Sequence, residues 1–121
     1  MAFSSIKKWG LKMKNRDFQT IYKKGKSFAN KYLVMYVMKN DMQENRLGIS
    51  VSKKVGNSVV RHRITRLIRE SFRLQSGKFL NGYDIVVIAR TNAHEKSYSE
   101  MESALLHLGK LHNIIEESSE N

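Results

Sequence analysis

Five arginines and one histidine lie close together between residues 61 and 73, and their side chains are suited to binding phosphate. At about 100° per residue, a helix would gather four of them on one face, which are His62, Arg66, Arg69 and Arg73. Arg61 and Arg63 flank that face. Guanidinium groups pair with phosphate oxygens through two donors and stay charged at any working pH. The spacing therefore predicts a helix that presents a row of cations to a polyanion.

Two alternatives to nucleic-acid binding exist for this helix. A charged helix face is often only solvated, but such a face usually mixes both signs, and Glu70 is the only carboxylate between Asn45 and Tyr83. Lys53, Lys54 and Asn57 precede the helix, where free N–H groups favour an anion. That loop has one glycine and no following Gly-Lys-Ser/Thr, so a nucleic-acid backbone is favoured over a bound mononucleotide.

Composition narrows the class of protein further. The chain has 121 residues and a net charge of +11, and residues 1 to 90 alone hold 20 basic and 5 acidic side chains. So uneven a charge indicates a nucleic-acid partner first and a membrane surface second. No segment resembles a transmembrane helix or a signal peptide, and the absence of cysteine excludes disulfides and zinc fingers. We expect a cytoplasmic protein with no membrane or DNA partner.

Aromatic residues offer a second possible contact with RNA. Phe18 and Tyr22 lie four residues apart on a predicted helix, and Tyr36 lies on a predicted strand. Bases stack on such rings when cations are near, and residues 23 to 31 supply four lysines. Core packing is the ordinary explanation of aromatic residues at this spacing. However, both faces of the strand at 32–38 are apolar, so one face is expected to remain as the floor of a groove.

Catalytic groups are missing from the basic region. The four histidines show no metal-ligand spacing, and no carboxylate pair that would hold Mg²⁺ lies near the arginines. No nucleophile and base stand out either. We therefore predict no catalytic and no metal-binding residue, so any linked chemistry belongs to another molecule.

The elements that would position these residues follow from local patterns. Helices are expected at 15–24, from Asn57 or Ser58 to about 76, and from a capping box at Ser97 or Ser99 to about 115. Strands are expected at 32–38, 46–52 and 83–89. This order predicts a two-layer α/β sandwich in one domain, residues 14–115, with a β-α-β unit of right-handed default crossover. Residues 1–13 are expected to be a flexible basic arm, and 116–121 a disordered acidic tail.

The run from Ser50 to Glu70 resembles the signature of the bacterial ribonuclease P protein subunit. Asp17-Phe18-Gln19, the stretches 22–25 and 27–30, and residues 84–90 match further, so the resemblance covers roughly residues 11 to 112. It implies an α+β fold of order α-β-β-β-α-β-α, like the second domain of ribosomal protein S5. It also implies a left-handed crossover around the arginine helix, contrary to the default above.

The resemblance also implies partners and sites. The family assists a catalytic RNA subunit, which holds Mg²⁺ and removes the 5′ leader from precursor tRNA. Phe18, Tyr22 and Tyr36 match the cleft for the leader. In the family, the arginine helix and the loop before it face the RNA subunit, and the matching positions here are Lys53, Asn57, Arg61, Arg63, Arg66 and Arg69. The pattern of charges in this sequence adds Lys54, His62 and Arg73 to this set. The family usually has Asn and Lys where this chain has His62 and Thr65, so we expect these contacts to be retuned.

Two other functions would also explain the basic charge of the chain. A ribosomal or general RNA-binding protein of the same fold would also be basic. A DNA-binding protein that places the arginine helix in a major groove is disfavoured, because no short helix and turn precede it.

Overall fold

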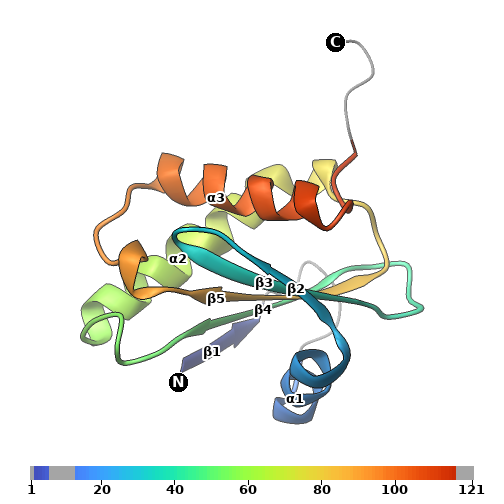
Figure 1. Cartoon of the computed structure of the whole chain (residues 1–121), viewed down its shortest axis with the longest axis horizontal. Coiled ribbons are helices and arrows are strands. Elements are labelled where there is room, and N and C mark those ends of the chain that lie inside the picture. The colour runs from blue at the N-terminus through green and yellow to red at the C-terminus, as the bar shows by residue number, and fades with distance from the viewer. Residues whose placement is uncertain (1, 6–12, 117–121) are drawn as a thin grey trace.

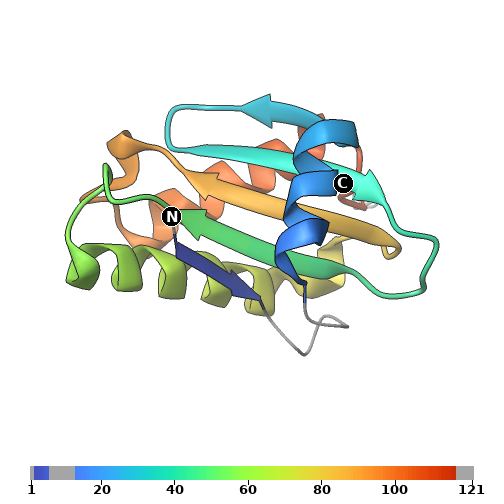
Figure 2. The same ribbon diagram turned by 90° about the horizontal axis from the view of Figure 1, so that it is seen from below.

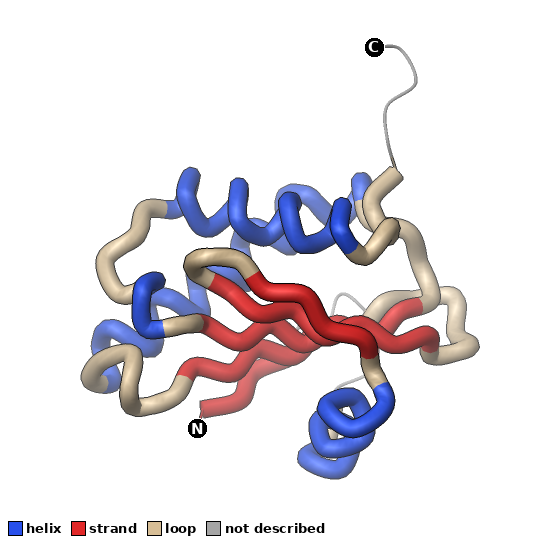
Figure 3. Tube along the Cα trace, in the orientation of Figure 1, coloured by secondary structure: helices blue, strands red, loops and turns tan. Residues whose placement is uncertain are grey.

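The computed structural model describes residues 2–5 and 13–116 (Figure 3). Three α-helices and five strands follow in the order β1 (Ala2–Ser5), α1 (Asn15–Lys24), β2 (Lys26–Ala29), β3 (Leu33–Lys39), β4 (Arg46–Val51), α2 (Ser58–Gln75), β5 (Tyr83–Ala89) and α3 (Tyr98–Leu111). Short 3₁₀ turns at Ser76–Lys78 and Thr91–Ala93 flank β5. The α+β class and the element order implied by the family resemblance are confirmed, with β1 as an addition, whereas β2 was missing from the strands predicted from local patterns.

The five strands form one sheet in the order β1-β4-β5-β3-β2. Among the described strands, only β4 and β5 pair in parallel, and they are joined through α2. Helices α2 and α3 cover one face, whereas α1 lies across the other (Figures 1 and 2). The main core lies between the sheet and the α2–α3 layer, and a smaller cluster lies beneath α1.

Local chemistry explains where the two long helices begin. Asn57 caps α2, because its side-chain oxygen accepts a hydrogen bond from the Val60 N–H at 3.0 Å. Ser97 and Glu100 form the predicted capping box of α3. The apolar face of α2 is buried as its spacing indicates, at Ile64, Ile68 and Ser71.

The last helix is shorter than predicted. It ends at Leu111 and not near Ile115, because Asn113 takes a positive φ of 60° and turns the chain. Ile115 then forms a β-bridge with Phe79. A short polar residue such as asparagine tolerates this left-handed conformation better than most residues, so the turn suits the residue that makes it.

The crossover around α2 is left-handed. Viewed from the side of α2 with β4 and β5 pointing up, β5 lies to the left of β4 (Figures 1 and 2). The right-handed default is therefore wrong for this chain, and the hand implied by the family resemblance is correct. This hand places α2 over β4, towards the edge of the sheet formed by β1 (Figure 2).

The N-terminal stretch differs from the flexible arm that was expected. Ala2–Ser5 forms β1, which pairs antiparallel with β4, and Met13 is buried beneath α1. The remainder of the predicted arm, residues 1 and 6–12, lies outside the described residues, as does the predicted tail at 117–121. Glu116 is still tied to the fold, because its N–H bonds the Lys78 carbonyl at 2.7 Å.

Candidate nucleic-acid interface

The candidate residues fall on two surfaces on opposite faces of the sheet. The first, called here the arginine surface, comprises α2 and the loop before it, with Lys53, Lys54, Asn57, Arg61, His62, Arg63, Arg66, Arg69 and Arg73. The second is the cluster beneath α1 that contains Phe18, Tyr22 and Tyr36, called here the aromatic cleft after the cleft that the family resemblance implies. The structure therefore gathers each predicted set but keeps the two sets apart.

Exposure on the arginine surface follows the predicted helical wheel. Seven of its nine side chains are exposed, and only Arg61 and Arg69 are partly covered. Burial of the opposite side of α2 against the sheet fixes this orientation, because Ile68 and Phe72 are almost fully enclosed. The row of cations is thus held on a rigid element, which lowers the entropic cost of ordering them for a ligand.

Several of these side chains already have partners within the protein. Arg61 Nε donates to the Gly56 carbonyl at 3.3 Å, and Arg63 Nη2 donates to the Lys96 carbonyl at 2.7 Å. Each guanidinium carries five N–H donors, so both retain donors for an anion. Asn57 uses its oxygen as the helix cap and keeps its side-chain N–H₂ group for other contacts.

Arg73 is paired with Glu70 on the same helix. Arg73 Nε lies 3.1 Å from Glu70 Oε1, and Arg73 Nη2 contacts the other carboxylate oxygen. Glu70 raises the pKa of Arg73. The Glu70 carboxylate therefore offsets the positive charge of Arg73, which was predicted to bind phosphate. Arg66 is exposed and forms no ion pair with any carboxylate among the described residues, so its charge is more available.

Phe18 supports the aromatic cleft from below and does not form its exposed wall. Its side chain is only 2% exposed and packs directly over Gly48. A Cβ at position 48 would lie 2.5 Å from the Phe18 Cζ, so the close approach requires glycine. Phe18 therefore lies buried in this structure, because α1 packs down on the sheet face that was expected to remain uncovered.

Tyr22 and Tyr36 form the part of the aromatic cleft that solvent can reach. Their ring centroids lie 5.2 Å apart in an edge-to-face arrangement, and both residues are partly exposed. Burial raises the pKa of the Tyr22 hydroxyl, and the nearby Ser50 side chain opposes that effect. Tyr22 is therefore neutral at physiological pH, which suits an aromatic face beside a polyanion.

Three charged residues that the sequence analysis missed anchor α1 on the sheet. Arg46 on β4 donates to Asp84 on β5 through Nε at 2.7 Å and Nη2 at 2.5 Å. Its Nη1 lies 3.4 Å from Asp17, whose carboxylate also accepts from the Lys14 N–H at the start of α1. A carboxylate inside an apolar strand is rarely buried without a partner. Asp84 was therefore the feature of the sequence that could have predicted an ion pair here.

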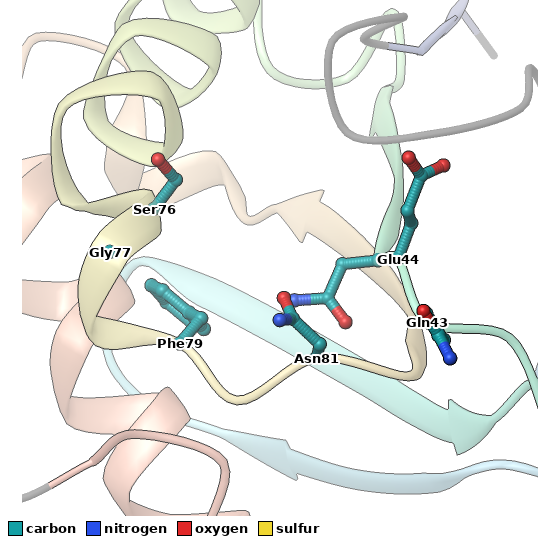
Figure 4. Close-up of a pocket in the computed structure, with 7 residues that line it drawn as sticks. Gln43, Glu44, Ser76, Gly77, Phe79 and Asn81 are labelled. Atoms are coloured by element: carbon teal, nitrogen blue, oxygen red, sulfur yellow. The ribbon is translucent and has the colours of Figure 1, made fainter.

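A separate polar pocket of about 360 Å³ lies where the loop before β4 meets the end of α2 (Figure 4). Its lining consists of Gln43, Glu44, Asn45, Ser76, Gly77, Phe79 and Asn81. Its described lining residues include no cation, so they offer a polyanion no favourable charge, and the pocket belongs to neither surface.

The described residues hold no group of three or more histidine, cysteine or acidic side chains that could bind a metal ion. No helix among residues 13–116 has the length and apolarity needed to cross a membrane.

Comparison with known proteins gives consistent matches. The family model described as Ribonuclease P matches residues 7–112. The ribonuclease P protein component of Lachnoclostridium phytofermentans is 64% identical over 104 residues, which cover 86% of this chain and 90% of the relative. That of Alkaliphilus metalliredigens is 57% identical over 95 residues, covering 78% and 86%.

Solved structures show the same similarity. The Staphylococcus aureus RNase P protein has a TM-score of 0.79 and 44% sequence identity, with 85% of this chain and 94% of that chain covered. The Thermotoga maritima RNase P protein also has a TM-score of 0.79, with 36% identity and coverage of 84% and 97%.

Proposed function

Since the chain belongs to the ribonuclease P protein family, whose role is in the 5′ processing of tRNA, we propose that it binds two RNAs at once. The arginine surface binds the catalytic RNA subunit. The aromatic cleft binds the single-stranded 5′ leader of precursor tRNA. The endonucleolytic removal of the leader then takes place on the RNA subunit, and the protein assists it.

The observation that carries this proposal is the separation of the two surfaces. Helices α2 and α3 cover one face of the sheet and α1 crosses the other, so the arginine surface and the aromatic cleft do not compete for one ligand (Figure 1). One surface offers charge for a folded RNA backbone, and the other offers tyrosine rings for unpaired bases. This division suits a protein that joins a catalytic RNA to its substrate.

The chemistry itself is assigned to the RNA subunit. That RNA would hold most of the Mg²⁺, which would supply an activated water for the cleavage. The protein contributes binding and electrostatics, because Arg66 and its neighbours offset phosphate repulsion between the two RNAs. We also place this complex in the cytoplasm, with neither DNA nor a membrane as a partner.

The test is cleavage of a 5′-extended precursor tRNA at low Mg²⁺ by the protein alone, the RNA subunit alone, and both together. Activity only in the mixture is expected, because the protein lowers the Mg²⁺ requirement of the RNA. Cleavage by the protein alone would contradict the assignment of catalysis to RNA. A mixture that stays inactive at low Mg²⁺, with an RNA that is active at high Mg²⁺, would favour a ribosomal or general RNA-binding protein.

A further inference from the structure

A hollow between α2 and the start of α3 combines charge with an aromatic ring. It measures about 550 Å³ and is lined by Arg63, Arg66, Leu67, Arg69, Glu70 and Tyr98. This volume lies within the range of about 300–1,000 Å³ typical of small-molecule sites. Tyr98 comes from α3, outside every residue that was assigned to RNA above. The hollow therefore extends beyond the arginine surface onto α3.

Hydrogen bonds between α2 and α3 fix the shape of this hollow. Arg63 Nη2 bonds the Lys96 carbonyl at 2.7 Å, which ties the loop before α3 to α2. The Tyr98 hydroxyl donates to Glu102 Oε2 at 2.8 Å, and Gln75 Nε2 from the end of α2 donates to the same oxygen at 2.7 Å. The Tyr98 side chain is thus anchored at its hydroxyl before any ligand arrives, which lowers the cost of binding.

The lining is matched to a nucleotide better than to an acidic peptide. Tyr98 supplies a flat ring and Leu67 an apolar wall for a base, while Arg66 and Arg69 supply donors for its phosphate. Among the lining residues in the described part of the chain, Glu70 is the one carboxylate, and its pairing with Arg73 offsets its charge. An acidic peptide would use the arginines but would leave the ring unused.

We infer that this hollow binds one unstacked nucleotide of the RNA subunit, with its base against Tyr98 and its phosphate on Arg66 and Arg69. The inference rests on the proposed function, because it takes the RNA subunit as the ligand of α2. It adds a base-stacking contact to a surface that is otherwise purely electrostatic. Such a contact selects an unpaired position in the RNA, which phosphate contacts alone cannot do.

Salt dependence separates a stacking contact from a phosphate contact. Loss of a phosphate contact weakens binding and lowers the slope of log Kd against log salt by about 0.7–0.9. Loss of a stacked base weakens binding without changing that slope, because no counterion is released by the ring. The two kinds of contact are therefore distinguishable in one titration series.

The experiment measures the affinity of the protein for its ribonuclease P RNA at several KCl concentrations. Tyr98→Leu is expected to bind about tenfold more weakly with an unchanged slope. Tyr98→Phe, which keeps the ring, should bind more tightly than Tyr98→Leu. Arg66→Ala should weaken binding and lower the slope. Tyr83→Leu, which removes a partly buried tyrosine far from the hollow, is the matched control, and thermal unfolding of each variant is recorded alongside.

The outcomes separate the inference from the proposed function. Normal binding by Tyr98→Leu together with weak binding by Arg66→Ala would overturn the inference and leave the proposed function standing. Normal binding by both would overturn the assignment of α2 to RNA as well. Equal losses in Tyr98→Leu and Tyr83→Leu, or equal losses in the leucine and phenylalanine variants, would also overturn the stacking contact.

A fluorescence measurement covers the case in which the leucine variant does not fold. Trp9 is the only tryptophan, so Tyr98→Trp in a Trp9→Phe background places the only indole at the hollow. Addition of the RNA subunit should quench its emission if a base stacks there. Unchanged emission at saturating RNA would overturn the inference.

Discussion

Arg46 and Asp84 face each other across the parallel strands β4 and β5 and are joined by two hydrogen bonds of 2.7 and 2.5 Å. The Asp84 carboxylate is almost completely buried, whereas the Arg46 guanidinium also reaches Asp17 at the start of α1. This contact joins the sheet to the helix that carries Tyr22. The geometry of the aromatic cleft therefore depends on an ion pair outside the cleft.

Asp84→Asn should lower the free energy of unfolding by about 3–5 kcal/mol, because it leaves the Arg46 charge without its buried partner. Urea unfolding of the variant and of the unchanged protein measures this difference in the free energy of unfolding. Asp41→Asn is the matched control, since Asp41 is exposed and its φ of 58° is one that asparagine also tolerates. A loss no larger than that of the control would show that the Arg46–Asp84 pair contributes little.

Gly48→Ala should displace α1 from the sheet. The new Cβ would lie 2.5 Å from Phe18 Cζ, and the resulting overpacking should cost about 1–3 kcal/mol. Affinity for leader-bearing precursor tRNA should fall with it. Gly77→Ala serves as the control, because no atom lies within 4 Å of a Cβ there. Equal stability of the two variants would argue against tight packing of Phe18.

Tyr36→Ala should weaken binding of leader-bearing precursor tRNA more than binding of mature tRNA. The expected difference is about 1–3 kcal/mol if one base stacks in the aromatic cleft. Affinities of the assembled complex for both RNAs provide the measurement, with Tyr36→Phe as the variant that retains the ring. An equal loss for both RNAs would indicate a structural role for Tyr36.

Arginines on α2 should differ in their effect on salt dependence. Arg66→Ala and Arg69→Ala should each weaken binding to the RNA subunit. Each should also lower the slope of log Kd against log salt concentration by up to about one. Arg73→Ala should do less, because Glu70 offsets the charge of Arg73. Conversely, Glu70→Gln should strengthen binding at low salt. Equal effects of all three arginine changes would contradict the role given to the Arg73–Glu70 pair.

Acid should destabilise the fold through His112. Its Nε2 lies 2.9 Å from the Met35 carbonyl, and its ring packs against Phe28. Burial lowers the pKa of His112 below its unfolded value of about 6.5, so the unfolded state takes up the proton first. Stability is therefore full above that value and falls as the pH drops towards the lowered pKa.

The measurement for His112 is urea unfolding at pH 7.5 and at pH 5.5. His112→Gln should show a smaller loss of stability between the two pH values than the unchanged protein. His62→Gln, at an exposed position, is the control for removing a histidine as such. An identical loss in the protein and in His112→Gln would rule out His112 as the source.

The sequence alone determined the features that depend on neighbours along the chain. The arginine face of α2, its Asn57 cap and strand β5 all follow from spacing within fewer than twenty residues. The sequence also predicts the class of partner, because net charge does not depend on the fold.

Tertiary structure decided the features that join distant segments. The burial of Phe18 over Gly48, the Arg46–Asp84–Asp17 contacts and the hollow beside Tyr98 each unite residues 28 or more positions apart. The left-handed crossover likewise depends on how β4, α2 and β5 pack. Periodicity reports which face of an element is apolar, but only packing decides which other element covers that face.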